Sequence, residues 1–184
     1  MSDPAFFGYG SLVNVATHDY AAPRPAAVHG WRRIWRSTEL RPEAFLSVSP
    51  APDSILHGLT ANVPGADWAL LDLRETGYRR YDVTEQLRQN GPVSQTAIYQ
   101  IKSEHHVEEA RPILLSYLDV VVQGYLQVYG PDGVAQFFAT TDGWDREVLD
   151  DRAAPQYPRH QRLSAAETAL VDHHLAQLPK RPAL

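Results

Sequence analysis

The chain has 184 residues, which is enough for one well-buried core and short for two, so we expect a single domain over 1–184. Its composition, 43% hydrophobic and 21% charged, is that of an ordinary soluble globular protein. The net charge of −5 argues against a nucleic-acid surface, which needs a concentrated positive footprint. The lack of cysteine excludes disulfides, thiolate zinc clusters and a thiol nucleophile.

The first residues, MSDPAFFGYG, lack the basic segment and long apolar segment of a secretory signal peptide. No apolar stretch approaches the length needed to cross a bilayer. We therefore expect a cytoplasmic protein with no membrane partner.

Strand patterns dominate the first hundred residues. The expected strands are Ala5–Tyr9, Ala26–Ser37 with a bulge at Gly30, Ala44–Ser49, and, after the proline-marked turn SPAPDS, Ile55–Val63. Asp67 then caps a short helix, WALLDLRE, which stops at Gly77. Another strand is expected at Thr96–Ile101.

The remaining residues are mainly helical in pattern. Glu104–Tyr129 is expected to form a helix that Pro112 breaks or kinks, and its apolar residues after the proline recur at three and four positions. Gln136–Thr140 is a candidate strand. A capping box, Ser164-Ala-Ala-Glu167, predicts a last amphipathic helix that ends near Leu178.

Strands that surround a few helices without regular βαβ alternation favour an α+β fold. We expect a small mixed β-barrel with a few flanking helices. The chemistry-bearing motifs fall within a core of about residues 5–140, and a C-terminal helical extension covers about 163–178.

The stretch FFGYGSLVN at residues 6–14 resembles several functional loops and fits none of the common ones. Val13 stands where a dinucleotide loop needs its third glycine. Ser11 is followed by Leu12, which rules out a phosphate-binding G-K-[ST] loop. In a hydrolase elbow the serine lies between the glycines, where this chain has Tyr9. The alternative that this stretch is only the end of a strand followed by a turn, with no functional role, remains open.

A second stretch, LLDLRETGYRRYDV at residues 70–83, places Glu75 at the end of the short helix. A carboxylate there faces the negative end of the helix dipole, which should raise its pKa and favour proton transfer near neutral pH. The alternative is a solvated glutamate flanked by Arg74 and Arg79.

Together the two stretches resemble the γ-glutamylcyclotransferase-like superfamily, and its ChaC-type branch most closely. The similar motifs occur in the family's order, as F-G-Y-G-S-L (7–12), G-W-R-R-x-W (30–35), G-L-T-A-N-V (58–63), R-E-x-G-Y (74–78) and S-Y-L…G-Y (116–125).

This resemblance implies an enzyme that converts a small γ-glutamyl compound into 5-oxoproline and a free amine, with no metal or cofactor. It implies Glu75 as the general acid/base. The loop Tyr9-Gly10-Ser11-Leu12 would bind the substrate through backbone N–H groups, the tyrosine ring and the serine hydroxyl. Tyr78 could donate a hydrogen bond to the substrate, or could be a core or rim tyrosine.

One departure from the family bears on the substrate. ChaC-type chains usually carry a longer loop with histidine and glycine after the tryptophan and arginine strand, where this chain has STELRPEAFLSVSPAPDS. Glutathione, γ-glutamyl amino acids and γ-glutamylamines therefore all stay open as substrates. Trp31, Arg33, Trp35 and Arg36 could line the pocket, but alternating tryptophan and arginine favours a half-buried strand.

Other readings are weaker. Two pairs of adjacent histidines occur, His105-His106 and His173-His174. On a helix the two side chains of such a pair point about 100° apart, so neither pair has the spacing of metal ligands. His174 is expected to be a packed structural residue. A homodimer could form on the helical face near Tyr125 and Tyr129. The alternatives to a cyclotransferase are a non-catalytic small-molecule-binding module on the same fold and a hydrolase that uses Ser11.

Overall fold

The computed structural model describes residues 3–178, which form nine strands and three α-helices. The strands are β1 (Ala5–Gly8), β2 (Ala21–Arg36), β3 (Phe45–Asn62), β4 (Tyr78–Asp82), β5 (Leu87–Gln89), β6 (Thr96–Ile101), β7 (Ile113–Leu114), β8 (Thr141–Asp142) and β9 (Val148–Leu149). The helices are α1 (Ala69–Arg74), α2 (Leu115–Ala139) and α3 (Ala165–Gln177), with 3₁₀ turns η1 (Ser11–Val13), η2 (Val15–Thr17), η3 (Pro64–Ala66) and η4 (Ser103–His105).

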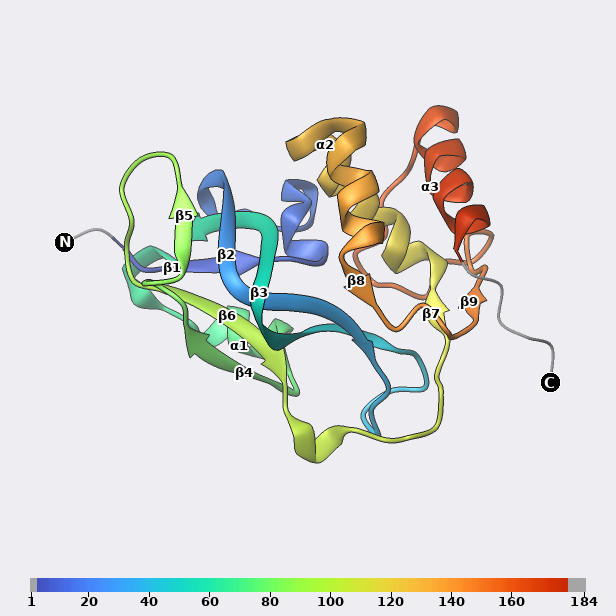
Figure 1. Cartoon of the computed structure of the whole chain (residues 1–184), viewed down its shortest axis with the longest axis horizontal. Helices are drawn as coiled ribbons and strands as arrows, with labels where there is room; N and C mark the ends of the chain where they lie inside the picture. Colours follow the sequence, from blue (N-terminus) through green and yellow to red (C-terminus); the bar gives the residue numbers. More distant parts are fainter. Residues whose placement is uncertain (1–2, 179–184) are drawn as a thin grey trace.

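The main sheet is mixed and runs in the order β4-β6-β1-β3-β2-β5, with β8 beside β2 (Figure 1). β1 pairs in parallel with β6, and β2 with β8, while the other neighbours are antiparallel. The α+β prediction is confirmed. Within the described residues the edge strands β4 and β5 do not pair with each other, so the sheet is open and the word barrel fits only loosely.

The two longest strands bend together at one irregularity. Pairing between β2 and β3 passes from Trp31↔Pro50 to His29↔Ile55, so one residue of β2 faces the unpaired residues 51–54 of β3. Gly30 allows the bend because its φ of +82° is one that residues with a side chain rarely adopt. The predicted bulge is confirmed, but the predicted turn SPAPDS is an irregularity within one strand.

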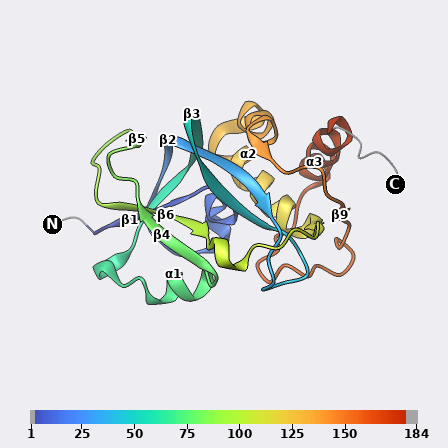
Figure 2. The ribbon, with the colours of Figure 1, turned by 60° about the horizontal axis from the view of Figure 1, so that its bottom comes forward.

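Helix α2 lies between the sheet and α3, whereas α1 lies along the sheet, away from both (Figures 1 and 2). Gly130 interrupts α2 with φ 69° and ψ −170°, and Pro131 starts its last segment, where its missing N–H costs nothing. The strand expected at Gln136–Thr140 is wrong, because Gln136–Ala139 complete this helix and bury Phe137 and Phe138. A short apolar run does not distinguish the two elements by period alone.

The helix expected from Glu104 begins only at Leu115. The residue before a proline is disfavoured in helical conformation, so Pro112 ends the helical pattern on its N-terminal side. The preceding segment forms the turn η4, and its His106 joins Thr38 in an isolated bridge.

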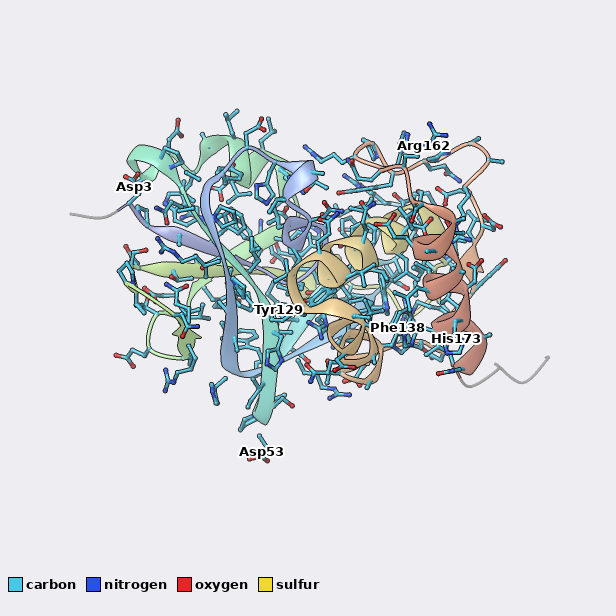
Figure 3. The ribbon with its side chains drawn as sticks, turned by 90° about the horizontal axis from the view of Figure 1, so that it is seen from above. Asp3, Asp53, Tyr129, Phe138, Arg162 and His173 are labelled. Carbon is cyan, nitrogen blue, oxygen red and sulfur yellow. The ribbon has the colours of Figure 1, made fainter. Side chains whose placement is uncertain are left out.

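The capping box of α3 is confirmed. The N–H of Glu167 donates to Ser164 Oγ at 3.2 Å, and the N–H of Ser164 donates to Glu167 Oε2 at 2.7 Å. The ring of His174 stacks on Phe138 of α2 at 4.9 Å, which confirms its structural role. Figure 3 labels Phe138 on α2 and, on α3, His173, the residue before His174.

A connected apolar core extends from Phe6 in β1 to Val171 in α3. Tyr125 is buried, and Tyr129 lies against β2, where its oxygen accepts from the N–H of Ala26 at 3.1 Å (Figure 3). This helical face is therefore covered within the chain, while the homodimer and the single domain stay predictions. Among residues 3–178, no helix has both the length and the apolar character needed to cross a bilayer.

Candidate active site

The loop after β1 is held in a conformation that only small residues permit. A Cβ on Gly8 would lie 2.6 Å from the Cβ of Leu12, and a Cβ on Gly10 would lie 2.6 Å from the hydroxyl oxygen of Tyr117. Both distances are shorter than van der Waals contact. The two glycines therefore let the chain turn tightly and let the first turn of α2 approach the loop.

The loop also presents backbone donors. Val13 N–H and Asn14 N–H close the η1 turn at 2.9 and 3.1 Å. In the described chain, the N–H groups of Gly10, Ser11 and Leu12 have no carbonyl partner, as expected at the start of a helical turn. Such N–H groups are suited to bind a carboxylate or a developing oxyanion.

Arg74 ties this loop to the end of α1. Its guanidinium donates to the backbone oxygen of Thr17 at 2.9 Å, to Thr17 Oγ1 at 3.0 Å and to Ser11 Oγ at 3.2 Å. The same side chain lies 3.5 Å from Glu75 Oε1. The position of Ser11 relative to Glu75 is therefore fixed by one arginine, and Ser11 keeps its own hydroxyl proton free to donate.

Glu75 follows the last residue of α1, and its side chain is 16% exposed. Burial raises the pKa of the Glu75 carboxyl, while the charges of Arg74, Arg159 and Arg41 act in the opposite direction. The predicted direction is confirmed, but burial rather than the dipole of a six-residue helix is the main cause. Within residues 3–178 the carboxylate accepts no hydrogen bond, and its one ion pair joins Oε1 to Arg74 at 3.5 Å.

Four tyrosines surround this carboxylate: Tyr9, Tyr78, Tyr99 and Tyr117. Burial raises the pKa of each hydroxyl above its ordinary value, and the negative charge of Glu75 adds to the rise. All four hydroxyls are therefore neutral at physiological pH. Among these five groups Glu75 is the one whose ordinary pKa lies below neutrality, and burial raises it.

The hydroxyl protons of these tyrosines differ in their use. Tyr9 Oη donates to the carbonyl of Tyr99 at 2.6 Å, and Tyr78 Oη donates to the carbonyl of Leu46 at 2.8 Å. The hydroxyl proton of Tyr78 is thus engaged with Leu46 in this structure, and its donation to a substrate stays a prediction. Within the described residues Tyr117 Oη donates to no acceptor, so its proton is available.

All six predicted site residues line one pocket with an empty volume of about 320 Å³, which we call the inner pocket. Its walls are Phe7, Gly8, Tyr9, Gly10, Ser11, Leu12, Leu46, Glu75, Tyr78, Tyr99 and Tyr117. The sequence singled out neither Leu46 nor Tyr117 as site residues. Tyr117 could have been found from its place in the S-Y-L motif, but the apolar periodicity of that segment predicts only a helix that packs on the core.

The carbonyl of Tyr9 is held from behind the pocket. Tyr125 Oη lies 3.0 Å from this carbonyl oxygen and accepts from Arg33 Nη1 at 2.7 Å. Arg33 is 1% exposed and also donates to Thr140 Oγ1 and Thr141 Oγ1, at 2.6 and 2.9 Å. The strand residues Trp31, Arg33 and Trp35 are thus buried outside the pocket, as a half-buried strand predicts.

A second pocket of about 380 Å³ adjoins the first and shares Leu46, Tyr78 and Tyr117 with it. We call it the outer pocket. Its other walls are Arg41, Glu43, Ala44, Phe45, Leu114 and Tyr157. The two pockets are therefore neighbours with three common walls, and Glu75 and the glycine loop line only the inner one.

The family comparison agrees with this geometry. The family model described as ChaC-like protein matches residues 5–124, which is well over half of the chain and includes the glycine loop, Glu75 and Tyr117. The chain belongs to the ChaC-like family. No curated protein sequence matches this ChaC-like chain.

Solved structures share the fold of this ChaC-like chain at low sequence identity. A structure named gamma-glutamyl cyclotransferase aligns at TM-score 0.61 and 12% identity, over 92% of this chain and 98% of its own. An uncharacterized protein from Homo sapiens aligns at 0.61 and 14%, over 91% and 97%. YkqA from Bacillus subtilis aligns at 0.59 and 15%, over 76% of this chain and 55% of its own length.

No group of three metal-ligating side chains occurs among residues 3–178 of the ChaC-like chain. His105 instead contacts Glu39 at 3.2 Å, and the ring nitrogen of His173 contacts Gln177 at 2.8 Å. Ser11, the residue of the hydrolase alternative, has Arg74 on its oxygen, and the described residues place no histidine on it. An arginine is not a base for serine, so the nucleophile reading loses its support.

Proposed function

We propose that this ChaC-like chain is a γ-glutamylcyclotransferase that cyclises the γ-glutamyl group of a small compound to 5-oxoproline and releases the free amine. The observation that supports this most directly is the largely buried carboxylate of Glu75. Within residues 3–178 this carboxylate, whose pKa is raised, accepts no hydrogen bond, and it lines the same pocket as a loop whose N–H groups have no carbonyl partner.

The reaction joins the substrate's α-nitrogen to its own γ-carbonyl carbon. Glu75 accepts a proton from the α-ammonium, and the free amine then attacks the carbonyl carbon. The developing oxyanion is stabilised by the N–H groups of Gly10 and Ser11, and by the hydroxyl of Tyr117. Because attacking atom and carbonyl belong to one folded substrate, most of the entropic barrier is already removed.

Collapse of the tetrahedral intermediate breaks the bond to the leaving nitrogen, which receives a proton from Glu75. Over the cycle the attacking nitrogen loses two protons, and the released amine carries two more than the amide nitrogen did. A single carboxyl group that relays both protons ends in its starting state. No external oxidant, reductant or nucleophile enters this balance.

The test is an assay for 5-oxoproline with glutathione, γ-glutamyl amino acids and γ-glutamylamines. We expect product from at least one class, and a loss of about 10²–10⁴-fold in kcat for Glu75→Gln, the usual contribution of a general acid/base. Thermal melting should stay unchanged or rise slightly, because burial already disfavours the charged carboxylate.

Two outcomes would contradict the proposal. If folded wild-type protein forms no 5-oxoproline from any of the substrates, the alternative of a non-catalytic binding module on this fold is favoured. Full turnover by Glu75→Gln would remove this residue from the acid/base role. As a matched control, Glu85→Gln changes an exposed glutamate in the turn between β4 and β5 and should retain activity.

A further inference from the structure

The outer pocket lies where the leaving group of a γ-glutamyl substrate must extend. With the glutamyl moiety beside Glu75 and the glycine loop, the substituent on the γ-nitrogen can leave the inner pocket past Leu46, Tyr78 and Tyr117, which belong to both pockets. The outer walls are mostly aromatic and aliphatic. They end at two charged residues, Arg41 and Glu43.

The backbone around Arg41 is held by hydrogen bonds to the segment that contains Arg111 and Pro112. Arg111 donates to the carbonyl oxygen of Arg41, and the N–H of Ala44 donates to the carbonyl of Pro112 at 2.7 Å. The N–H of Arg111 itself donates to Ser37 Oγ at 3.0 Å. The loop from residue 38 to residue 44 is therefore held at both ends, although it lies outside the regular strands.

The guanidinium of Arg41 packs on an aromatic ring and has no acidic partner within the described residues. It lies 5.3 Å from the ring centre of Phe45, a wall of the outer pocket, and in the described chain it forms no ion pair. A guanidinium on an aromatic face keeps its donor edge free for a planar carboxylate. Arg41 therefore supplies a ready anion-binding group at the mouth of this pocket.

Two charges of opposite sign could select opposite leaving groups, so their placement relative to the reaction centre matters. The charge of Arg41 lowers the pKa of both Glu75 and Tyr78, which shows that its field reaches the inner pocket. Glu43 is absent from the groups that shift either pKa. The positive charge is thus the one that acts on the space where the leaving nitrogen lies.

We propose that the outer pocket is the leaving-group subsite and that Arg41 selects leaving amines that carry a carboxylate. This inference rests on the proposed cyclotransferase function and narrows its substrate class. α-Amino acids and short peptides meet the requirement, because each carries a carboxylate beyond its nitrogen. γ-Glutamylamines lack this carboxylate and are the poorer class.

A pair of substrates that differ only in this group tests the proposal. γ-Glutamyl-phenylalanine and γ-glutamyl-phenethylamine have the same ring and chain, and only the first has a carboxylate on the leaving side. We expect wild-type kcat/KM to be roughly fivefold to thirtyfold higher for the first, as for a charge-assisted contact at a partly exposed site. The difference should lie mainly in KM.

Arg41→Met should bring the ratio of the two kcat/KM values close to one, and Arg41→Lys should restore part of it. The matched control Arg79→Met removes an exposed arginine of β4 that lines neither pocket, and it should keep the wild-type ratio. High salt should lower the wild-type ratio, because the contact is partly exposed.

Several results would overturn the inference while leaving the cyclotransferase proposal in place. One is that the wild type forms 5-oxoproline equally well from both substrates. Another is that Arg41→Met lowers the kcat/KM values for both substrates by the same factor. A ratio that changes with Glu43→Gln instead of Arg41→Met would assign selection to the acidic residue. Absence of 5-oxoproline from every substrate overturns the proposed function together with this inference.

Discussion

Adding one methyl group to the glycine loop should disturb the candidate site in a way that the structure specifies. In Gly10→Ala, the new Cβ lies 2.6 Å from Tyr117 Oη and 3.4 Å from Leu46 Cδ2. The tyrosine has little room to move away, because its ring packs edge-on against Trp35 at 5.9 Å and Tyr157 at 5.0 Å. The strain therefore falls on the loop.

Overpacking of this kind costs about 1–3 kcal/mol of the free energy of unfolding. For a chain of roughly 150–250 residues this corresponds to a fall in Tm of about 2–12 °C. A loop displaced by about 1 Å also misplaces the donors for the oxyanion, so 5-oxoproline formation should fall by about 10²-fold. Thermal melting and product assays on the same purified protein measure both effects.

A double substitution isolates the cause. Tyr117→Phe removes the oxygen that the new Cβ would strike, so in that background Gly10→Ala should cost about 1 kcal/mol less than in wild type. A Gly10→Ala protein as stable and active as wild type would refute the steric argument. So would an equal cost of the alanine with and without the tyrosine hydroxyl.

Two further predictions concern charge near Glu75 and the last helix. Arg159→Gln removes a charge that lowers the pKa of Glu75, so the acidic limb of the kcat/KM profile, where the base becomes protonated, should move to higher pH, and by less at high salt. A limb that moves to lower pH or stays in place at low salt would contradict this. Ser164→Ala removes the N-cap of α3 and should cost about 0.5–2 kcal/mol in a denaturant melt, while kcat/KM stays unchanged because α3 lines neither pocket.

The parts of the fold that local sequence signals specify were predictable. Short-range periodicity predicted α1 and α3 to within one or two residues, and the capping box predicted the start of α3, whereas the N-cap of α1 is Trp68 and not the predicted Asp67. The strand period gave β1, β6 and most of β2. The two-residue strands β7, β8 and β9 are too short for any period, and they exist because distant partners lie beside them.

Prediction failed where distant contacts override local pattern. Phe137 and Phe138 fit either a strand or a helix, and the choice is made by Pro131, which starts a helical turn after the break at Gly130. At the site, motifs brought Glu75 and the glycine loop together, although they lie some sixty residues apart. The outer pocket was not predictable, because Arg41 and Phe45 lie in a segment that differs from the family pattern and is placed by Arg111.

The buried Arg33 has a consequence for the order in which parts of the chain can fold during synthesis. Arg33 needs Tyr125, Thr140 and Thr141, which lie 92 to 108 positions further on. Until those residues have left the ribosome, the guanidinium has no place in an apolar interior, and the carbonyl of Tyr9 lacks its support. The stretch shared with the family ends at residue 124, one residue before the first of these partners. The nascent chain thus carries Glu75 and the glycine loop early, whereas the support of the Tyr9 carbonyl is complete only after residue 141 has been made.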